Sequence, residues 1–330
     1  ITDEDCKIMA QTITKEEILK VQKIRGRGNS RIYKVVTESN QVYALKYYPD
    51  MLLDPRSRLQ TEVQSCQLLE TYQLTPKVIA YDAELNIAIY EWIEGDHLQS
   101  VENEHIDQAL NFIKILQDIE TPEFSKPASE ACTSAEQLFH QIEERHKKLD
   151  SIENNILQNF LNTIFKPLYL DVKNWSTQQW PANNFHEILA SVKQTLSPSD
   201  FGIHNTIMRS DGTLCFLDLE YFGWDDPVKL IADFIWHPAM TLNDDHKKRW
   251  VKNSFLIFKN SEELKQRFHA AWPLYGMRWV MILLNEFSEE GWQKKIHVDD
   301  NLEIFREQKH REQLDKAVKI CDLIKLHQIE

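Results

Sequence analysis

The segments SDFGIHN at residues 199–205 and DLE at residues 218–220 decide how the rest of the chain is interpreted. They place Asp200, Asn205 and Asp218 at intervals of five and thirteen residues, around short β-like runs joined by a hairpin turn signal. A carboxylate can align or deprotonate an attacking hydroxyl, and carboxylate and amide oxygens suit Mg²⁺ better than a soft metal. Phosphoryl transfer needs this combination of groups. We therefore expect these three residues to form the chemical centre of a phosphoryl-transfer site.

A lysine upstream of this centre lies in a predicted strand. Lys46 belongs to the stretch QVYALKYY at residues 41–48. Because an unpaired ammonium is expensive to bury among apolar and aromatic neighbours, it needs an anionic partner. Glu62, sixteen residues later on a helix predicted over residues 56–72, is the natural partner, and such a pair would hold the ammonium against nucleotide phosphates. The alternative is an edge-strand lysine whose ammonium reaches solvent.

A glycine-containing turn precedes this lysine. Gly26, Gly28, Asn29 and Ser30 lie between two strand-like stretches, and glycine lets backbone N–H groups approach an anion closely. These residues could cover the phosphates of a nucleotide, or they could form only a tight hairpin. No Lys-Ser or Lys-Thr pair follows the glycines, which excludes a P-loop of the Walker A type.

The predicted secondary structure changes near residue 95. Residues 1–94 predict strands around one prominent helix, and a short helix is also expected at residues 15–21, where a capping-box pattern begins. Residues 95–330 show helical periodicity over most of their length. The expected fold class is therefore α+β, with a small β-rich lobe at residues 1–94 and a larger, mostly helical lobe at residues 95–330.

Composition limits the classes of partner. The 330 residues carry 38 Lys and Arg against 51 Asp and Glu, a net charge of −13, which argues against nucleic acid or an anionic membrane as the main partner. The longest apolar run is the hexamer at residues 279–284, too short to span a membrane. The five cysteines form no C-x-x-C pair, which disfavours a disulfide framework and a zinc site. With no secretory signal visible at the amino terminus, we expect a reduced, cytoplasmic protein.

These motifs resemble those of the aminoglycoside phosphotransferase and choline kinase family, small-molecule kinases with the bilobal protein-kinase-like fold. The resemblance covers nearly the whole chain. It is sharpest where DLEY at residues 218–221 and GWDDP at residues 223–227 are similar to the family's D-F-E-Y…G-W-x-D-P segment. It implies transfer of the γ-phosphate of ATP, with Mg²⁺, to a hydroxyl of a small molecule. The acceptor stays open among sugars, amino sugars, amino alcohols and aminoglycosides, and the sequence does not give an oligomeric state.

The resemblance also implies roles for individual residues. Asp200 would be the catalytic base that receives the proton of the acceptor hydroxyl, and Asn205 and Asp218 would ligate Mg²⁺. Lys46 would bind the nucleotide phosphates, and Glu62 would orient Lys46. Further nucleotide contacts are implied in the glycine turn and in the stretch that matches the family's interlobe hinge: Gly26, Gly28, Asn29, Ser30, Glu91 and Ile93.

Two departures from the family pattern matter. Residues 198–200 are Pro-Ser-Asp, whereas the family usually has His-Gly-Asp, and the missing histidine is generally structural. Leu230 lies near a position where the family tends to have an aspartate, and the later Asp233 receives no role. A nucleotide-binding pseudokinase with a regulatory or binding role is therefore the alternative, although the set of chemical groups is intact. A protein kinase is disfavoured because no D-F-G…A-P-E segment follows Asp218.

Several charged and aromatic residues near these motifs allow two interpretations. Glu220 could reach a second Mg²⁺ or pair with a cation of the large lobe. The carboxylates at residues 225–226 could recognise a cationic acceptor together with Trp224 and Trp236, but solvated turn carboxylates and core tryptophans are the favoured interpretation. Arg278 could bind an anionic group of the acceptor, although pairing with a buried carboxylate is commoner.

Overall fold

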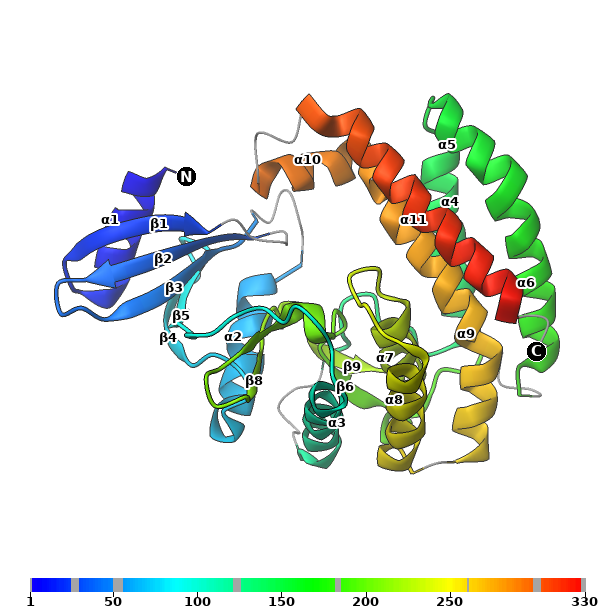
Figure 1. The fold of residues 1–330 in the computed structure, drawn as a ribbon, viewed down its shortest axis with the longest axis horizontal. Helices are drawn as coiled ribbons and strands as arrows, with labels where there is room; N and C mark the ends of the chain where they lie inside the picture. Colours follow the sequence, from blue (N-terminus) through cyan, green and yellow to red (C-terminus); the bar gives the residue numbers. More distant parts are fainter. Residues whose placement is uncertain are drawn as a thin grey trace. The chain divides into compact units, whose positions relative to one another are not determined.

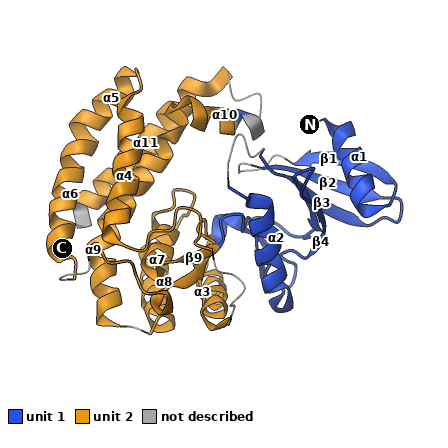
Figure 2. Cartoon of the chain, turned by 180° about the vertical axis from the view of Figure 1, so that it is seen from behind, with its two compact units in different colours: residues 1–99, 203–222, 296–300 blue, residues 100–202, 223–295, 301–330 orange. Residues whose placement is uncertain are grey.

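The computed structural model describes residues 2–24, 30–49, 56–120, 126–181, 185–259, 261–298 and 304–327. The chain divides into two compact units, shown blue and orange in Figure 2. The first unit contains residues 1–99, 203–222 and 296–300, and the second contains residues 100–202, 223–295 and 301–330. An antiparallel sheet in the amino-terminal part and helices in the carboxyl-terminal part confirm the predicted α+β class. The lobe boundary predicted at residues 94 and 95 stays a prediction.

The first unit is built on a five-stranded antiparallel sheet in the order β1-β2-β3-β5-β4, coloured blue to cyan in Figure 1. Its strands are β1 (Ile18–Ile24), β2 (Arg31–Thr37), β3 (Val42–Tyr47), β4 (Val78–Asp82) and β5 (Ile87–Glu91). Alternate residues of β2 are buried, as the period of two predicts, and Tyr33 and Val35 pack with Leu45 of β3. Cys6 and Ala10 of helix α1 (Asp3–Thr14) complete this core.

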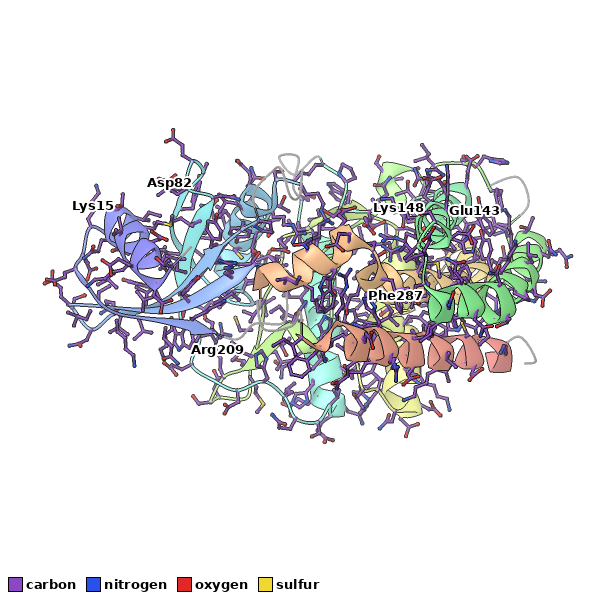
Figure 3. The ribbon with its side chains drawn as sticks, turned by 90° about the horizontal axis from the view of Figure 1, so that it is seen from above. Lys15, Asp82, Glu143, Lys148, Arg209 and Phe287 are labelled. Carbon is purple, nitrogen blue, oxygen red and sulfur yellow. The ribbon has the colours of Figure 1, made fainter. Side chains whose placement is uncertain are left out.

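The short helix expected at residues 15–21 is wrong. The helix lies earlier: α1 ends at Thr14, and its C-cap Lys15, labelled in Figure 3, has a left-handed φ of 58°. The Thr14 hydroxyl donates to the carbonyl of Ala10 at 2.8 Å, so this threonine closes a helix rather than opening one. The following residues instead pair with β2 as strand β1.

The prominent helix of the first unit is α2 (Arg58–Leu69), which η1 (Glu70–Tyr72) continues by one 3₁₀ turn. The helix predicted over residues 56–72 is therefore confirmed. Its apolar residues Leu59, Val63 and Cys66 are buried, as their spacing predicts. The same helix also buries the charged side chains of Arg58 and Glu62.

A hairpin from later in the chain belongs to the first unit. It consists of η4 (Ile203–Asn205), β7 (Thr206–Met208) and β8 (Leu214–Phe216), and it confirms the predicted turn. Gly212 supplies the turn with a φ of 83°, a conformation that costs glycine little. Asp96 exchanges two backbone hydrogen bonds with Met208, and Phe216 donates its amide to the carbonyl of Leu74.

The second unit is mostly helical, with a two-stranded sheet of β6 (Thr195–Ser197) and β9 (Gly223–Asp225). The long helix α9 packs against α4, α6, α7 and α11. Within the described residues, no helix is both long and apolar enough to cross a membrane. The bounds of the helices are α3 Asn103–Asp118, α4 Ala135–Asp150, α5 Asn155–Phe160, η2 Leu161–Phe165, α6 Lys166–Gln179, η3 Ser191–Lys193, α7 Pro227–Trp236, α8 Asp244–Ile257, α9 Glu262–Leu283, η5 Leu284–Phe287, α10 Glu289–Val298 and α11 Arg306–His327.

Candidate active site

A buried ion pair joins β3 and α2 in the first unit. The Nζ atom of Lys46 lies 2.6 Å from Oε2 of Glu62, so the predicted pair is present. Both residues are buried, because β3 is an inner strand of the sheet and α2 packs near it. The hydroxyl of Tyr48 donates to the same Glu62 oxygen at 2.8 Å and also hydrogen-bonds Tyr90. The alternative of a lysine that reaches solvent is therefore wrong.

Two further carboxylates surround the same ammonium. Asp218 Oδ1 lies 2.5 Å from Nζ of Lys46, and Glu220 Oε2 lies 3.2 Å from it. Burial opposes the charge of Lys46, but the carboxylates of Asp218, Glu220 and Glu62 outweigh it and hold the pKa of Lys46 well above its ordinary value. The lysine is therefore a cation held by three carboxyl groups.

The acids around Lys46 differ in the direction in which their pKa is shifted. Burial, which Lys46 only partly offsets, raises the pKa of Glu62 to about 7. Burial acts in the same sense on Glu220, but Lys46 and Arg58 outweigh it and lower the pKa of Glu220 below its ordinary value. Glu62 is thus the acid of this cluster that most readily takes up a proton.

Glu220 pairs with cations, but not with one of the large lobe, so that interpretation is wrong about the partner. Its Oε1 lies 2.5 Å from an Nη atom of Arg58, and its Oε2 accepts a hydrogen bond from the Ser30 hydroxyl at 3.1 Å. The cations come from β3 and α2, in the same unit, rather than from the large helical lobe. The side chain of Glu220 is almost fully buried, so it serves here to fix Lys46 and Arg58.

The β7–β8 hairpin brings the backbone segments that carry the two predicted Mg²⁺ ligands next to each other. Asn205 precedes β7 directly, Asp218 follows β8, and the amide of Leu217 donates to the carbonyl of Asn205 at 2.8 Å. Asp218 has a φ of 65°. Its side chain is 23% exposed, more than those of Glu62 and Glu220.

These residues fit a divalent cation by the chemistry of their oxygen atoms. The carboxylate atoms of Glu62, Asp218 and Glu220 lie within 4.8 Å of one another. Carboxylate and amide oxygens are the ligands that Mg²⁺ prefers, and Mg²⁺ usually takes only one or two protein carboxylates. All three carboxylates contact Lys46, but only Asp218 is appreciably exposed, so Asp218, with the amide of Asn205, is the better candidate.

The structure describes only some of the other residues that were predicted to contact the nucleotide. Ser30 is buried and holds Glu220, whereas Gly26, Gly28 and Asn29 lie outside the described residues. Glu91 ends β5 with an exposed side chain, and its backbone amide donates to the carbonyl of Lys77 at 2.9 Å. Ile93 is buried two residues later. Their nucleotide contacts stay predictions.

The second unit holds Asp200 in the loop that follows β6. The preceding Ser199 has a φ of 67°, in the left-handed region that a non-glycine residue rarely enters. Its hydroxyl donates to the carbonyl of Ser129 at 3.0 Å and accepts a hydrogen bond from Lys229 Nζ at 3.0 Å. Two polar contacts therefore fix the residue that replaces the glycine of the family pattern.

Aromatic packing fixes the other side of this loop. The ring of Phe201 stacks on Phe112 of α3 at 5.1 Å and lies 5.8 Å from Phe234 of α7. Phe234 in turn stacks on Trp250 of α8 at 3.8 Å. Asp200 is thus held between a polar anchor at residue 199 and an apolar anchor at residue 201, while its own side chain stays 32% exposed.

A histidine that the sequence motifs do not indicate contacts Asp200. Nε2 of His237 lies 3.2 Å from Oδ1 of Asp200. The two residues are separated by 37 positions, and His237 follows the last residue of α7, where no motif marks it. The family-like motif nearest to it is the GWDDP segment at residues 223–227, and this motif does not specify the position of a histidine.

The carboxylates expected to be solvated are buried, so that interpretation of residues 225–226 is wrong. Asp225 accepts from Lys229 Nζ at 2.8 Å and from the amide of Cys132. Asp226 caps α7 by accepting the amide of Val228 and pairs with Arg267. Burial raises the pKa of Asp226 against the opposing effect of Arg267. These acids stabilise the start of α7.

Arg278 forms the commoner of the two arrangements predicted for it. Its guanidinium lies 3.3 Å from a carboxylate oxygen of Asp233 and 3.1 Å from one of Glu130. Asp233 also accepts from the indole of Trp279 at 2.8 Å and lies 3.6 Å from Lys229. Arg278 is therefore part of a buried network that ties α9 to α7.

The family follows from the chain as a whole. A model of the APH phosphotransferase enzyme family matches residues 20–255, a range that includes Lys46, Asp200 and Asp218. The chain belongs to this family. It is therefore a phosphotransferase enzyme of the small-molecule kinase type, as the motif resemblance predicted. A comparison with curated protein sequences gives no match.

Solved structures of other phosphotransferases share the fold. Choline kinase LicA from Streptococcus pneumoniae is 14% identical, with 96% of this chain and 98% of that chain covered and a TM-score of 0.58. Spectinomycin phosphotransferase APH(9)-Ia, in complex with ADP and spectinomycin, is 11% identical over 98% and 99%, with a TM-score of 0.65. An ethanolamine kinase from Plasmodium vivax is 17% identical over 92% and 84%, with a TM-score of 0.54. These similarities confirm the predicted fold of the APH family.

Proposed function

We propose that this APH-family enzyme transfers the γ-phosphate of ATP, with Mg²⁺, to a hydroxyl group of a small molecule. The observation that carries the proposal is the cluster of Lys46 with Glu62 and Asp218, an always-charged ammonium fixed beside an oxygen donor set for Mg²⁺. Similar structures named as a choline kinase, an ethanolamine kinase and a spectinomycin phosphotransferase, the last in complex with ADP, support the same chemistry.

In this proposal the first unit handles the nucleotide. Lys46 binds phosphate oxygens, and Glu62 with Tyr48 keeps the ammonium from moving. Asn205 and Asp218 would hold Mg²⁺, which when bound neutralises the charge of the phosphates. Glu220 holds Lys46 through its Oε2 atom and Arg58 through its Oε1 atom.

The acceptor would meet Asp200. As the acceptor oxygen forms its bond to the γ-phosphorus, the bond from that phosphorus to the β–γ bridging oxygen breaks, and the hydroxyl proton passes to Asp200. The fixed loop between Ser199 and Phe201 supports this role, because an aligned base must hold its carboxylate in one direction. The chemical class of the acceptor is a sugar, amino sugar, amino alcohol or aminoglycoside.

ATP consumption with Mg²⁺ across a panel of these four acceptor classes tests the proposal. We expect turnover on one class by the parent enzyme and none by Asp200→Asn, which should still bind Mg·ATP in calorimetry. Asp118→Asn makes the same chemical change on an exposed residue of α3 and should behave like the parent. Equal turnover by Asp200→Asn would contradict the role of Asp200. Mg·ATP binding without turnover on any class would favour the pseudokinase alternative.

A further inference from the structure

The environment of His237 fixes the direction of its ring. Its Nδ1 accepts the backbone amide of Ala239 at 3.1 Å. In a neutral imidazole one nitrogen accepts and the other carries the proton. The proton of neutral His237 is therefore on Nε2, the nitrogen that lies 3.2 Å from Oδ1 of Asp200.

The ring has little freedom to turn away from this carboxylate. The backbone amide of His237 donates to the carbonyl of Asp233 at 2.9 Å and so closes α7. The ring meets the indole of Trp279 edge to face, with centroids 4.5 Å apart, and that indole is itself held by Asp233. Only 13% of the His237 side chain is exposed. The histidine is thus presented to Asp200 in a fixed orientation.

We propose that His237 is a positioning residue for Asp200, an inference that rests on the proposed function. The N–H group of neutral His237, 3.2 Å from Oδ1, attracts this carboxylate oxygen electrostatically and so orients Asp200, which leaves Oδ2 to receive the proton of the acceptor hydroxyl. Asp200 alone takes that proton. His237 does not relay it, because a second ring proton would have to sit on Nδ1 and would displace the amide of Ala239.

Paired substitutions separate this role from a packing role. His237→Leu keeps an apolar side chain against Trp279 but removes the donor, whereas His237→Gln can place an amide N–H near the position of Nε2. A misdirected base costs up to about 100-fold, so we expect His237→Leu to lower kcat by about 10- to 100-fold with an unchanged KM for Mg·ATP. His237→Gln should restore kcat to within about threefold of the parent.

The controls make the kinetic outcome decisive. His140→Leu, on an exposed position of α4, should leave kcat unchanged. Parent-like kcat for His237→Leu, in an enzyme that Asp200→Asn inactivates, would overturn the positioning role while leaving the proposed function intact. A loss of kcat that His237→Gln does not restore would also overturn it. No turnover by the parent enzyme on any acceptor would instead contradict the proposed function. The positioning role of His237 would then be overturned as well, because it depends on that function.

A spectroscopic measurement tests the contact without turnover. In ¹⁵N-histidine-labelled protein, the His237 signals, assigned by their loss in His237→Gln, should show the tautomer with its proton on Nε2. The Asp200→Asn variant should shift the Nε2 resonance, because the carboxylate beside it has become a neutral amide. A proton on Nδ1, or an Nε2 resonance that ignores Asp200→Asn, would overturn the inference.

Discussion

At the scale of single residues, Lys46 shows how one charge organises a site. It is buried on β3 with three carboxylates within 3.2 Å, so the removal of its ammonium would take this cation from Glu62, Asp218 and Glu220 together. Breaking a buried ion pair from one side typically costs about 3–5 kcal/mol. The same ammonium is the proposed ligand of the nucleotide phosphates. Stability and nucleotide binding therefore depend on one atom.

Lys46→Met tests both consequences. We expect the free energy of unfolding to fall by about 3–5 kcal/mol, because the methionine fills the space but removes the ammonium that the carboxylates share. Calorimetry on the folded variant should show no binding of Mg·ATP. Lys20→Met, an exposed substitution on β1, is the matched control and should change neither quantity. Parent-like affinity for Mg·ATP in Lys46→Met would contradict the phosphate-binding role.

Residue pairs differ in how far the sequence predicts them. The contact of Lys46 with Glu62 could be predicted, because a buried lysine on a strand needs an acid and the next helix offers one on its buried face. The contact of Asp200 with His237 could not. It depends on where α7 ends relative to a loop 37 residues earlier, and neither hydrophobic period nor motif spacing contains that distance.

At the scale of elements, the loop that presents Asp200 relies on Ser199. Its left-handed backbone costs a non-glycine residue about 1–2 kcal/mol, and its hydroxyl contacts Ser129 and Lys229. The family pattern usually has glycine at this position, which needs no such contacts. The serine hydroxyl therefore compensates in part for the backbone strain.

Ser199→Gly and Ser199→Ala should separate the two effects. Both lose the hydroxyl contacts, but only alanine retains the strain, so Ser199→Ala should be less stable than Ser199→Gly by about 1 kcal/mol. Ser199→Gly should also keep the higher kcat, because its backbone can hold the loop conformation without the contacts. Urea unfolding and steady-state kinetics measure these differences. Equal stability of the two variants would show that residue 199 carries no backbone strain.

The elements themselves were predicted unevenly for a physical reason. Helix α2 and the β7–β8 hairpin followed from apolar spacing and from a turn signal, which are local properties. The pattern at residues 14–17 failed because threonine and glutamate serve equally well at the end of a helix, where the Thr14 hydroxyl donates back to Ala10. Capping residues mark a boundary, but they do not by themselves say which side is helical.

At the scale of the whole molecule, two half-buried histidines of the second unit make stability depend on pH. Burial lowers the pKa of His146, which stacks on Phe165, and burial also lowers the pKa of His310, which stacks on Phe287. In the unfolded chain both would titrate near pH 6.5. The unfolded state therefore binds protons that the folded state does not as the pH falls below about 6.5, and folding stability decreases in that range.

The double variant His146→Gln, His310→Gln should weaken this dependence. Its midpoint of thermal unfolding should fall less than that of the parent between about pH 7 and pH 5.5, where the histidines but few carboxylates titrate. Above about pH 7 the two proteins should show parallel profiles. Thermal scans in buffers of constant ionic strength measure the difference. Parallel profiles over the whole range would assign the acid sensitivity to other groups.

The path of the chain explains why nucleotide binding should be a property of the whole molecule. After residue 99 the chain builds much of the second unit, including Asp200, and then returns for residues 203–222 to supply Asn205 and Asp218 to the unit of Lys46. A change in the sequence texture near residue 95 could predict two lobes, but it could not predict this return. The return depends on backbone pairing of Met208 with Asp96 and of Phe216 with Leu74, far away in the sequence.

Mg·ATP should therefore stabilise the folded chain in a way that needs both early and late residues. A ligand at 100 times its Kd adds about 2.7 kcal/mol to the free energy of unfolding, so the midpoint of thermal unfolding should rise by several degrees. ATP with a chelator should give a smaller rise, because Asp218 and Asn205 would then lack the cation that they are proposed to share with the phosphates. The Asp218→Asn variant should give little response to Mg²⁺. A full rise with ATP and chelator would contradict the Mg²⁺ role of the hairpin, while leaving the role of Lys46 in place.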